Sequence, residues 1–172
     1  MWTLLVLCPN WLFGSATAIG VLPIGVLPIG DTVFECPATM NDLDCVEQFL
    51  AGFPYAVVGA SRNRLKYGNK VLRAYLQAGR IVYPVNPAID KVESITAYPD
   101  LVRLPEPVHA VSVVTPPPVT EEVVQQAGEL GIRNIWLQPG SESQEAVAKA
   151  VDFDMNVIFG GPCVLVALGY RE

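Results

Sequence analysis

The chain has 172 residues, a length that suits one domain whose core needs neither disulfides nor a metal. Hydrophobic residues make up 51% of the sequence and charged residues 16%, which is typical of a compact soluble protein and excludes a disordered chain. Seventeen acidic residues against eleven basic ones give a net charge of -6, which argues against nucleic acid as a partner. We therefore expect a cytoplasmic protein that binds neither nucleic acid nor membrane.

The first forty residues differ from the rest of the chain. They carry no charge in their first thirty positions, and residues 21–30 are a tandem repeat, VLPIGVLPIG. A signal peptide needs a basic start and a spanning helix needs about twenty uninterrupted apolar residues, whereas Pro9 and Asn10 interrupt this segment early. We predict an extension of uncertain structure over residues 1–40, with Met40 as an alternative start. A membrane or export role, or packing onto the domain, are the alternatives.

The predicted domain, residues 41–172, alternates between helices and strands, beginning with a short helix at 41–50. Five apolar runs that end in Gly or Pro indicate buried parallel strands at 55–61, 80–87, 109–117, 134–140 and 156–162. Amphipathic stretches predict helices at 69–78, 119–130 and 143–153. The expected core includes Val71, Leu72, Tyr75, Leu76 and Trp136. This order implies an α/β fold: a Rossmann-like, doubly wound, mainly parallel sheet of about five strands with helices on both faces.

Ligands of such sheets bind outside the carboxyl ends of the strands. Every predicted strand ends in a Gly or Pro turn, so these turns should meet at one rim of the sheet. The rim would consist of the turn 59–68, the corner 84–87, the segment 115–118 and the loop 138–140.

The first of these turns gathers positive charge. Six of the eleven basic residues fall between Arg62 and Arg80, and no acidic residue occurs between Glu47 and Asp90. The start of the following helix offers free backbone N–H groups to an anion. Gly59 and Ala60 keep the backbone approachable, Ser61 adds a hydroxyl donor, and Gly68 lets the helix begin close to the sheet. We therefore predict a pocket for a phosphate-rich nucleotide that uses Arg62, Arg64 and Lys66. The simpler alternatives are that Ser61 only caps the turn and that Arg64 and Lys70 are solvated.

A nicotinamide or flavin dinucleotide fits this turn less well. The G-x-G-x-x-G pattern requires glycine at the positions of Ser61 and Arg64, and the second strand ends in Asn86 and Pro87 rather than in an acid for the ribose diol. An oxidoreductase with an NADP-like cofactor stays open as an alternative, because the basic turn suits an extra ribose phosphate.

Four spaced segments carry a family resemblance: VVGASRNRLKYGNKVLRAYLQAGRIVYPVNP at 57–87, TAYPDL at 96–101, SVVTPPP at 112–118 and GIRNIWLQPG at 131–140. Over roughly residues 45–163 the chain resembles the small stand-alone CoA-binding domain family, which is similar to the nucleotide-binding domain of the succinyl-CoA synthetase alpha subunit.

The resemblance implies a Rossmann-like fold that binds CoA or an acyl-CoA across the strand ends. The residues expected to contact the ligand are Gly59, Ala60, Ser61, Arg62, Lys66, Tyr67, Gly68, Asn86, Pro87, Thr115 and Pro116. We expect binding without catalysis and without metal, because the sequence offers neither a nucleophile with its base nor a set of metal ligands. His109 enters a strand at its amino end, away from the crevice, and is not expected to act as a base or a phosphoryl carrier. A regulatory subunit with an unknown protein partner is the further alternative.

The four cysteines, Cys8, Cys36, Cys45 and Cys163, lie too far apart in sequence for a metal knuckle and are expected to be free thiols. We expect Cys163, at the end of the last strand, to be a buried thiol. The alternative is that Cys163 faces the crevice and exchanges with the thiol of CoA.

Overall fold

The computed structural model describes residues 42–161 and 163–172. Its main sheet has five parallel strands: β1 (Tyr55–Val58), β2 (Val82–Val85), β5 (Ala110–Val113), β6 (Asn134–Leu137) and β7 (Asn156–Ile158). Their order across the sheet is β2-β1-β5-β6-β7, which is the doubly wound order of flavodoxin-like sheets. The predicted α/β fold with a parallel sheet is confirmed. The predicted extension at 1–40, with Met40, Cys8 and Cys36, lies outside the described residues.

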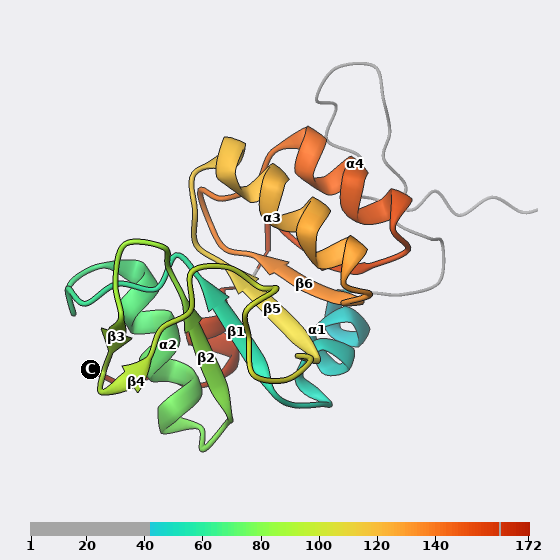
Figure 1. The fold of residues 1–172 in the computed structure, drawn as a ribbon. Coiled ribbons are helices and arrows are strands. Elements are labelled where there is room, and N and C mark those ends of the chain that lie inside the picture. Colours follow the sequence, from blue (N-terminus) through green and yellow to red (C-terminus); the bar gives the residue numbers. More distant parts are fainter. Residues whose placement is uncertain (1–41, 162) are drawn as a thin grey trace, which may run out of the picture. The chain divides into compact units, whose positions relative to one another are not determined.

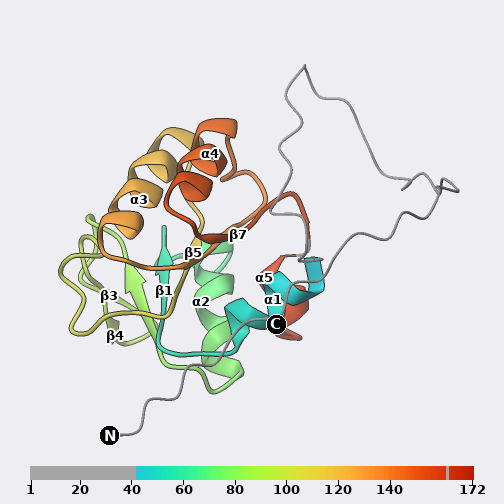
Figure 2. The same ribbon diagram turned by 90° about the vertical axis from the view of Figure 1, so that its right-hand side faces the viewer.

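Helices cover both faces of this sheet, as expected (Figure 1). One face is covered by α1 (Asp42–Leu50), α2 (Tyr67–Gln77) and the short α5 (Val164–Ala167), and the other by α3 (Pro117–Glu129) and α4 (Gln144–Asp152). The period of two along β1 explains the two layers, because Tyr55 and Val57 pack on the α1–α2 face while Ala56 and Val58 pack on the α3–α4 face. Figure 2 shows α5 next to α1 and α2, on that same face.

Four of the five predicted core side chains are buried. Val71, Leu72 and Tyr75 are fully buried on α2, and Trp136 on β6 is 1% exposed. The prediction for Leu76 is wrong, because its side chain is 37% exposed. Leu76 lies in the last turn of α2, at the margin of the helical stripe that faces the sheet.

A two-stranded hairpin follows β2 and was not predicted. Its strands are β3 (Lys91–Val92) and β4 (Ile95–Thr96), which pair antiparallel. Glu93 and Ser94 form the tip with positive φ angles of 47° and 67°. Such tips usually carry Asn-Gly or Asp-Gly, so Glu-Ser gave no turn signal in the sequence. Beyond the hairpin, Tyr98 bridges to Val85 at the end of β2, which brings the tip close to the turn after β1.

Candidate functional site

The sheet has its topological switch point between β1 and β5. From β1 the chain passes to α2 on one face, and from β5 it passes to α3 on the other. A pocket of about 300 Å³ opens beside this point, at the carboxyl ends of β1, β2 and β5. Four of the predicted site residues line it: Gly59, Asn86, Pro87 and Thr115. The remaining lining residues are Val58, Val85, Pro99, Asp100, Leu101, Val119, Glu122, Val123 and Gln126.

Two glycines allow the backbone segments around the switch point to approach one another. Gly59 has a φ of 88°, and a Cβ on it would lie 2.3 Å from the carbonyl oxygen of Val114. A Cβ on Gly68 would lie 2.1 Å from the carbonyl oxygen of Gly59. Since both close contacts are with backbone, no side-chain motion relieves them. Only glycine therefore lets α2 begin directly against the end of β1.

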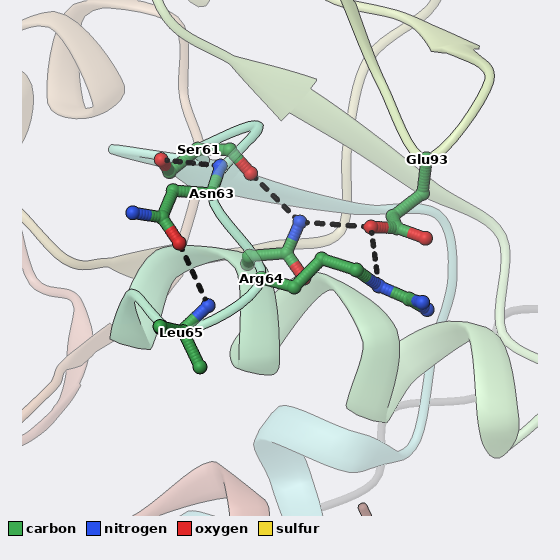
Figure 3. Close-up of polar contacts among 6 residues, drawn as sticks. Ser61, Asn63, Arg64, Leu65 and Glu93 are labelled. Atoms are coloured by element: carbon green, nitrogen blue, oxygen red, sulfur yellow. Dashed lines mark hydrogen bonds and ion pairs between the residues drawn. The ribbon is translucent and has the colours of Figure 1, made fainter.

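The turn between β1 and α2 is shaped by its own side chains (Figure 3). The Ser61 hydroxyl accepts a hydrogen bond of 3.2 Å from the Asn63 amide, and the Asn63 side-chain oxygen accepts one of 3.0 Å from the Leu65 amide. Lys66 then caps α2 through its extended backbone, without a side-chain capping bond. Ser61 thus has the turn-forming role that was one of the two interpretations of this residue, and its hydroxyl hydrogen is still available to a ligand.

Two asparagines brace this turn from neighbouring elements. The Asn86 side chain donates to the carbonyl of Ala60 at 2.7 Å and accepts from the amide of Ala88 at 2.9 Å. Asn69, fully buried on α2, donates to the carbonyl of Ser61 at 2.8 Å. The side chain of Asn86 therefore holds the turn in place while the residue lines the pocket.

Glu93, at the hairpin tip, reaches the same turn. One of its carboxylate oxygens lies 3.0 Å from the side-chain nitrogen of Asn69 and 3.2 Å from Nε of Arg64. Sequence reasoning missed both Asn69 and Glu93. The only signal for Asn69 was a polar residue on the buried face of the helix, and nothing marked Glu93 because its hairpin was not predicted.

The basic residues between 62 and 80 do not converge on one pocket, contrary to the sequence-based expectation. Only the first three belong to the turn: Arg62 donates to the carbonyl of Lys91 at 3.2 Å, Arg64 pairs with Glu93, and Lys66 makes no ion pair or side-chain hydrogen bond among the described residues. Within the described part of the chain, the turn therefore has one basic side chain without a protein partner, Lys66, and two that contact the hairpin, Arg62 and Arg64.

The other three basic residues point elsewhere. Lys70 pairs with Glu172 at 2.6 Å, Arg73 lies over the ring of Tyr170, and Arg80 donates to the carbonyl of Leu50. Because α2 has eleven residues and rises about 1.5 Å per residue, Arg80 lies about 16 Å from the turn, at the amino edge of the sheet. Closeness in sequence was therefore a poor guide to closeness in space.

The predicted rim segment 115–118 leads into α3. Pro116 caps this helix with Pro117 at its first position, and the Thr115 hydroxyl lies 2.9 Å from that of Thr120. Thr115 lines the pocket, whereas Pro116 does not. Two carboxylates that sequence reasoning did not single out, Asp100 and Glu122, also line it.

Tyr67 and Cys163 lie on the α2–α5 side of the rim. The Tyr67 hydroxyl donates to the side-chain oxygen of Gln138 at 3.3 Å. Cys163 caps α5 and is half-buried, whereas Cys45 is buried, so the expectation of a buried thiol at position 163 is wrong. It was wrong because β7 ends at Ile158, and Cys163 belongs to the turn that follows.

His109 directly precedes β5, at the amino edge of the sheet. Its amide donates to the carbonyl of Pro54 at 2.8 Å, and its ring lies edge-on to Tyr55. This places it away from the pocket, as expected. Over the described residues, no helix is long and apolar enough to cross a membrane.

A parallel doubly wound sheet with a pocket at its switch point and a glycine-dependent turn places the chain among Rossmann-type ligand-binding domains. Comparison with protein families is more specific. The model of the CoA binding domain matches residues 54–169, and the chain belongs to this family.

The chain is also similar to parts of larger enzymes. It is 29% identical over 105 residues to acetate–CoA ligase [ADP-forming] II from Archaeoglobus fulgidus, covering 60% of this chain and 16% of the relative. It is 30% identical over 122 residues to the alpha subunit of acetate–CoA ligase [ADP-forming] II from Pyrococcus furiosus, covering 63% of this chain and 26% of the relative. The chain thus spans about a quarter or less of the length of these curated relatives.

Among solved structures, a conserved hypothetical protein from Pyrococcus furiosus matches with a TM-score of 0.62 and 38% sequence identity. The match covers 66% of this chain and 97% of that one. The same fold therefore also occurs as a small single-domain protein.

Proposed function

We propose that this domain binds CoA or an acyl-CoA, with the phosphates at the turn 59–68 and the adenine in the pocket at the switch point. The observation that carries the proposal is the close packing of Gly68 on Gly59, which puts the start of α2 at the mouth of the pocket. The family membership supports CoA as the nucleotide. The relatives' printed activity with CoA adds to this support.

The start of α2 suits phosphate for three reasons. The first N–H groups of a helix lack intrahelical acceptors and carry a partial positive charge. Lys66 contributes an ammonium without a protein partner among the described residues, and no acidic residue stands in the first turn of the helix. In this proposal Lys66 and Arg62 contact phosphate oxygens, and Ser61 donates its free hydroxyl hydrogen.

The pocket has the size of a nucleobase and is too small for a whole CoA molecule. Its 300 Å³ lies at the small end of the range for ligand pockets. Its walls are largely valine, leucine and proline, and the carboxylate of Glu122 can accept from an exocyclic amine. The second carboxylate, Asp100, also accepts from the amide of Arg103 at 3.0 Å. An adenine fits these requirements, and the rest of CoA would extend along the rim toward Tyr67.

The proposed role is non-catalytic binding, in the cytoplasm, by the domain at 41–172. The predicted ligand contacts are the backbone of Gly59, Ala60 and Gly68 and the side chains at the strand ends. The alternative role is that of a regulatory subunit whose protein partner binds according to whether CoA is bound.

Calorimetric titration of the full chain with CoA, dephospho-CoA, NADP and NAD, each at two salt concentrations, tests the proposal. We expect CoA to bind best, to lose affinity without its ribose phosphate, and to weaken with salt because phosphate contacts are screened. Tighter binding of NADP than of CoA, or binding of none of the four, would contradict it.

A further inference from the structure

Cys163 lies in a cluster of polar groups at the rim. It directly precedes α5, is half-buried, and its sulfur lies next to the hydroxyl of Tyr67. The Tyr67 hydroxyl donates in turn to Oε1 of Gln138. These three side chains come from the turn before α5, the start of α2 and the loop after β6, so the fold brings them together from distant parts of the sequence.

The side-chain amide of Gln138 bonds to this cluster through its oxygen and has an N–H group without an acceptor among the described residues. Its Oε1 accepts from the amide of Val164 at 3.1 Å, which fixes the orientation of the side chain. Gln138 is fully buried, and its Nε2 has no acceptor among the described residues. A buried donor without an acceptor is rare in folded proteins and indicates a missing partner. An amide carbonyl, such as the two in the pantetheine arm of CoA, has the required chemistry.

The cluster is also within reach of the proposed phosphate site. Tyr67 is the first residue of α2, immediately after Lys66, and its single side chain spans the distance from the phosphate turn to Cys163. The pantetheine arm is longer than a tyrosine side chain. We propose that Cys163, with Tyr67 and Gln138, forms the thiol end of the CoA site and captures CoA as a mixed disulfide; this rests on the proposed function.

The step is a thiol–disulfide exchange whose oxidant is the disulfide of CoA. The Cys163 thiolate attacks one sulfur of that disulfide, the bond between the two CoA sulfurs breaks, and a bond forms between Sγ and one CoA. The second CoA leaves as a thiolate and takes a proton from solvent. Cys163 is oxidised and one half of the CoA disulfide is reduced.

The surroundings of Cys163 favour the attacking thiolate. Burial raises the pKa of the thiol, but the amides of Val166 and Leu165 and the Tyr67 hydroxyl, which can donate to the thiolate in place of Gln138, outweigh burial. The pKa of Cys163 therefore lies below its ordinary value. Cys163 is half-buried, so its sulfur is not enclosed in the core. Cys45 is buried and serves as an internal comparison.

The test treats the reduced full chain with CoA disulfide and follows the adduct by intact mass and peptide mapping. The control is pantethine, which has the same disulfide and arm but lacks the nucleotide. We expect the adduct on Cys163 to form at least about tenfold faster with CoA disulfide, because nucleotide binding raises the local concentration of the disulfide. Lys66→Ala should slow the reaction with CoA disulfide and leave that with pantethine unchanged. Cys163→Ser should abolish the mapped adduct.

Two results overturn the inference. One is equal rates with CoA disulfide and pantethine, which would make Cys163 merely reactive. The other is an adduct confined to other cysteines. Calorimetry with reduced CoA on the same preparation separates the two proposals: if CoA binds and no selective adduct forms, only the disulfide inference fails. If CoA does not bind, the proposed function fails and the disulfide inference with it.

Discussion

Arg64 and Glu93 pair across the candidate phosphate turn, with Nε of Arg64 3.2 Å from a carboxylate oxygen of Glu93 (Figure 3). The same oxygen accepts from Asn69 at 3.0 Å. A carboxylate thus lies where the proposed ligand would bring its own negative charge. The hairpin carrying Glu93 is linked to the turn a second time, through Arg62 and the carbonyl of Lys91.

We predict that Glu93→Gln raises the affinity for CoA. The substitution removes a negative charge next to the proposed phosphates and frees Arg64 to contact them. Because Arg64 is well exposed, the gain should be only about two- to fivefold, in line with surface ion pairs. Calorimetric titration of both proteins with CoA at low salt measures it.

The matched control is Glu129→Gln, which removes the same charge near the end of α3, where Glu129 contacts only Gln125 among the hydrogen-bond partners described. If the two variants bind CoA equally well, the gain comes from the change in net charge. Glu93 then does not compete with the CoA phosphates for Arg64.

Lys66→Ala should weaken CoA binding more than Arg73→Ala. Lys66 stands at the start of α2 without a protein partner among the described residues, whereas Arg73 lies over the ring of Tyr170. We expect a loss of about tenfold for Lys66→Ala, since a hydrogen bond to a charged group contributes about 1.5 kcal/mol. Arg73 is two turns further along the helix, about 10 Å away and beyond a Debye length of about 8 Å at physiological salt. Titration of each variant with CoA checks this, and equal losses would show that the phosphates lie elsewhere.

The strands and their ligand-side turns were predictable because their signals are local. Each strand of the main sheet is a short apolar run followed within three residues by a Gly or Pro, and the conformation of Gly59 follows from its place in the turn. The predicted strands were longer than the observed ones because Gly and Pro mark the turn that follows a strand and not its last paired residue.

The rest of the site depends on contacts between distant segments. Glu93 reaches Asn69 only because an unpredicted hairpin folds back along β2. Cys163 meets Tyr67 because α5 packs beside α2, and periodicity gives no such information about a four-residue helix. The dispersal of the basic residues along α2 is visible in a helical projection of the sequence, but their partners at the end of the chain are not.

Gly68→Ala should destabilise the domain by about 1–3 kcal/mol, as expected when an added methyl group meets packed atoms. The Cβ would lie 2.1 Å from the carbonyl oxygen of Gly59, so α2 would have to move away from the end of β1. The same displacement should weaken CoA binding. Denaturant unfolding and titration with CoA measure the two effects.

Gly161→Ala is the comparison, because its Cβ meets only one atom, at an ordinary 3.7 Å. This variant should stay within about 0.5 kcal/mol of the parent. Equal stability of Gly68→Ala and Gly161→Ala would contradict the close packing at the switch point.

The buried phenol of Tyr75 should make the domain sensitive to alkaline pH. Its hydroxyl lies 2.7 Å from that of Ser112 in the core, and burial raises its pKa far above the ordinary value of 10.0. Below pH 10 the phenol is neutral in both states and its contribution to stability does not change. Above pH 10 the unfolded chain loses this proton and the folded chain keeps it, so the free energy of unfolding falls by up to about 1.4 kcal/mol per pH unit.

The measurement is urea unfolding between pH 9 and 11, compared between Ser112→Ala and the double variant Tyr75→Phe/Ser112→Ala. Both proteins lack the Ser112 hydroxyl, so they differ only in the phenol of Tyr75. Ser112→Ala removes the hydrogen-bond partner of that phenol and lowers stability at every pH, so the comparison uses the slopes with pH and not the absolute stabilities. The double variant should lose stability less steeply with pH above 10, since Phe has no proton to release. Parallel pH profiles for the two proteins would mean that Tyr75 ionises as readily in the folded chain as in the unfolded one, which its burial against the sheet argues against.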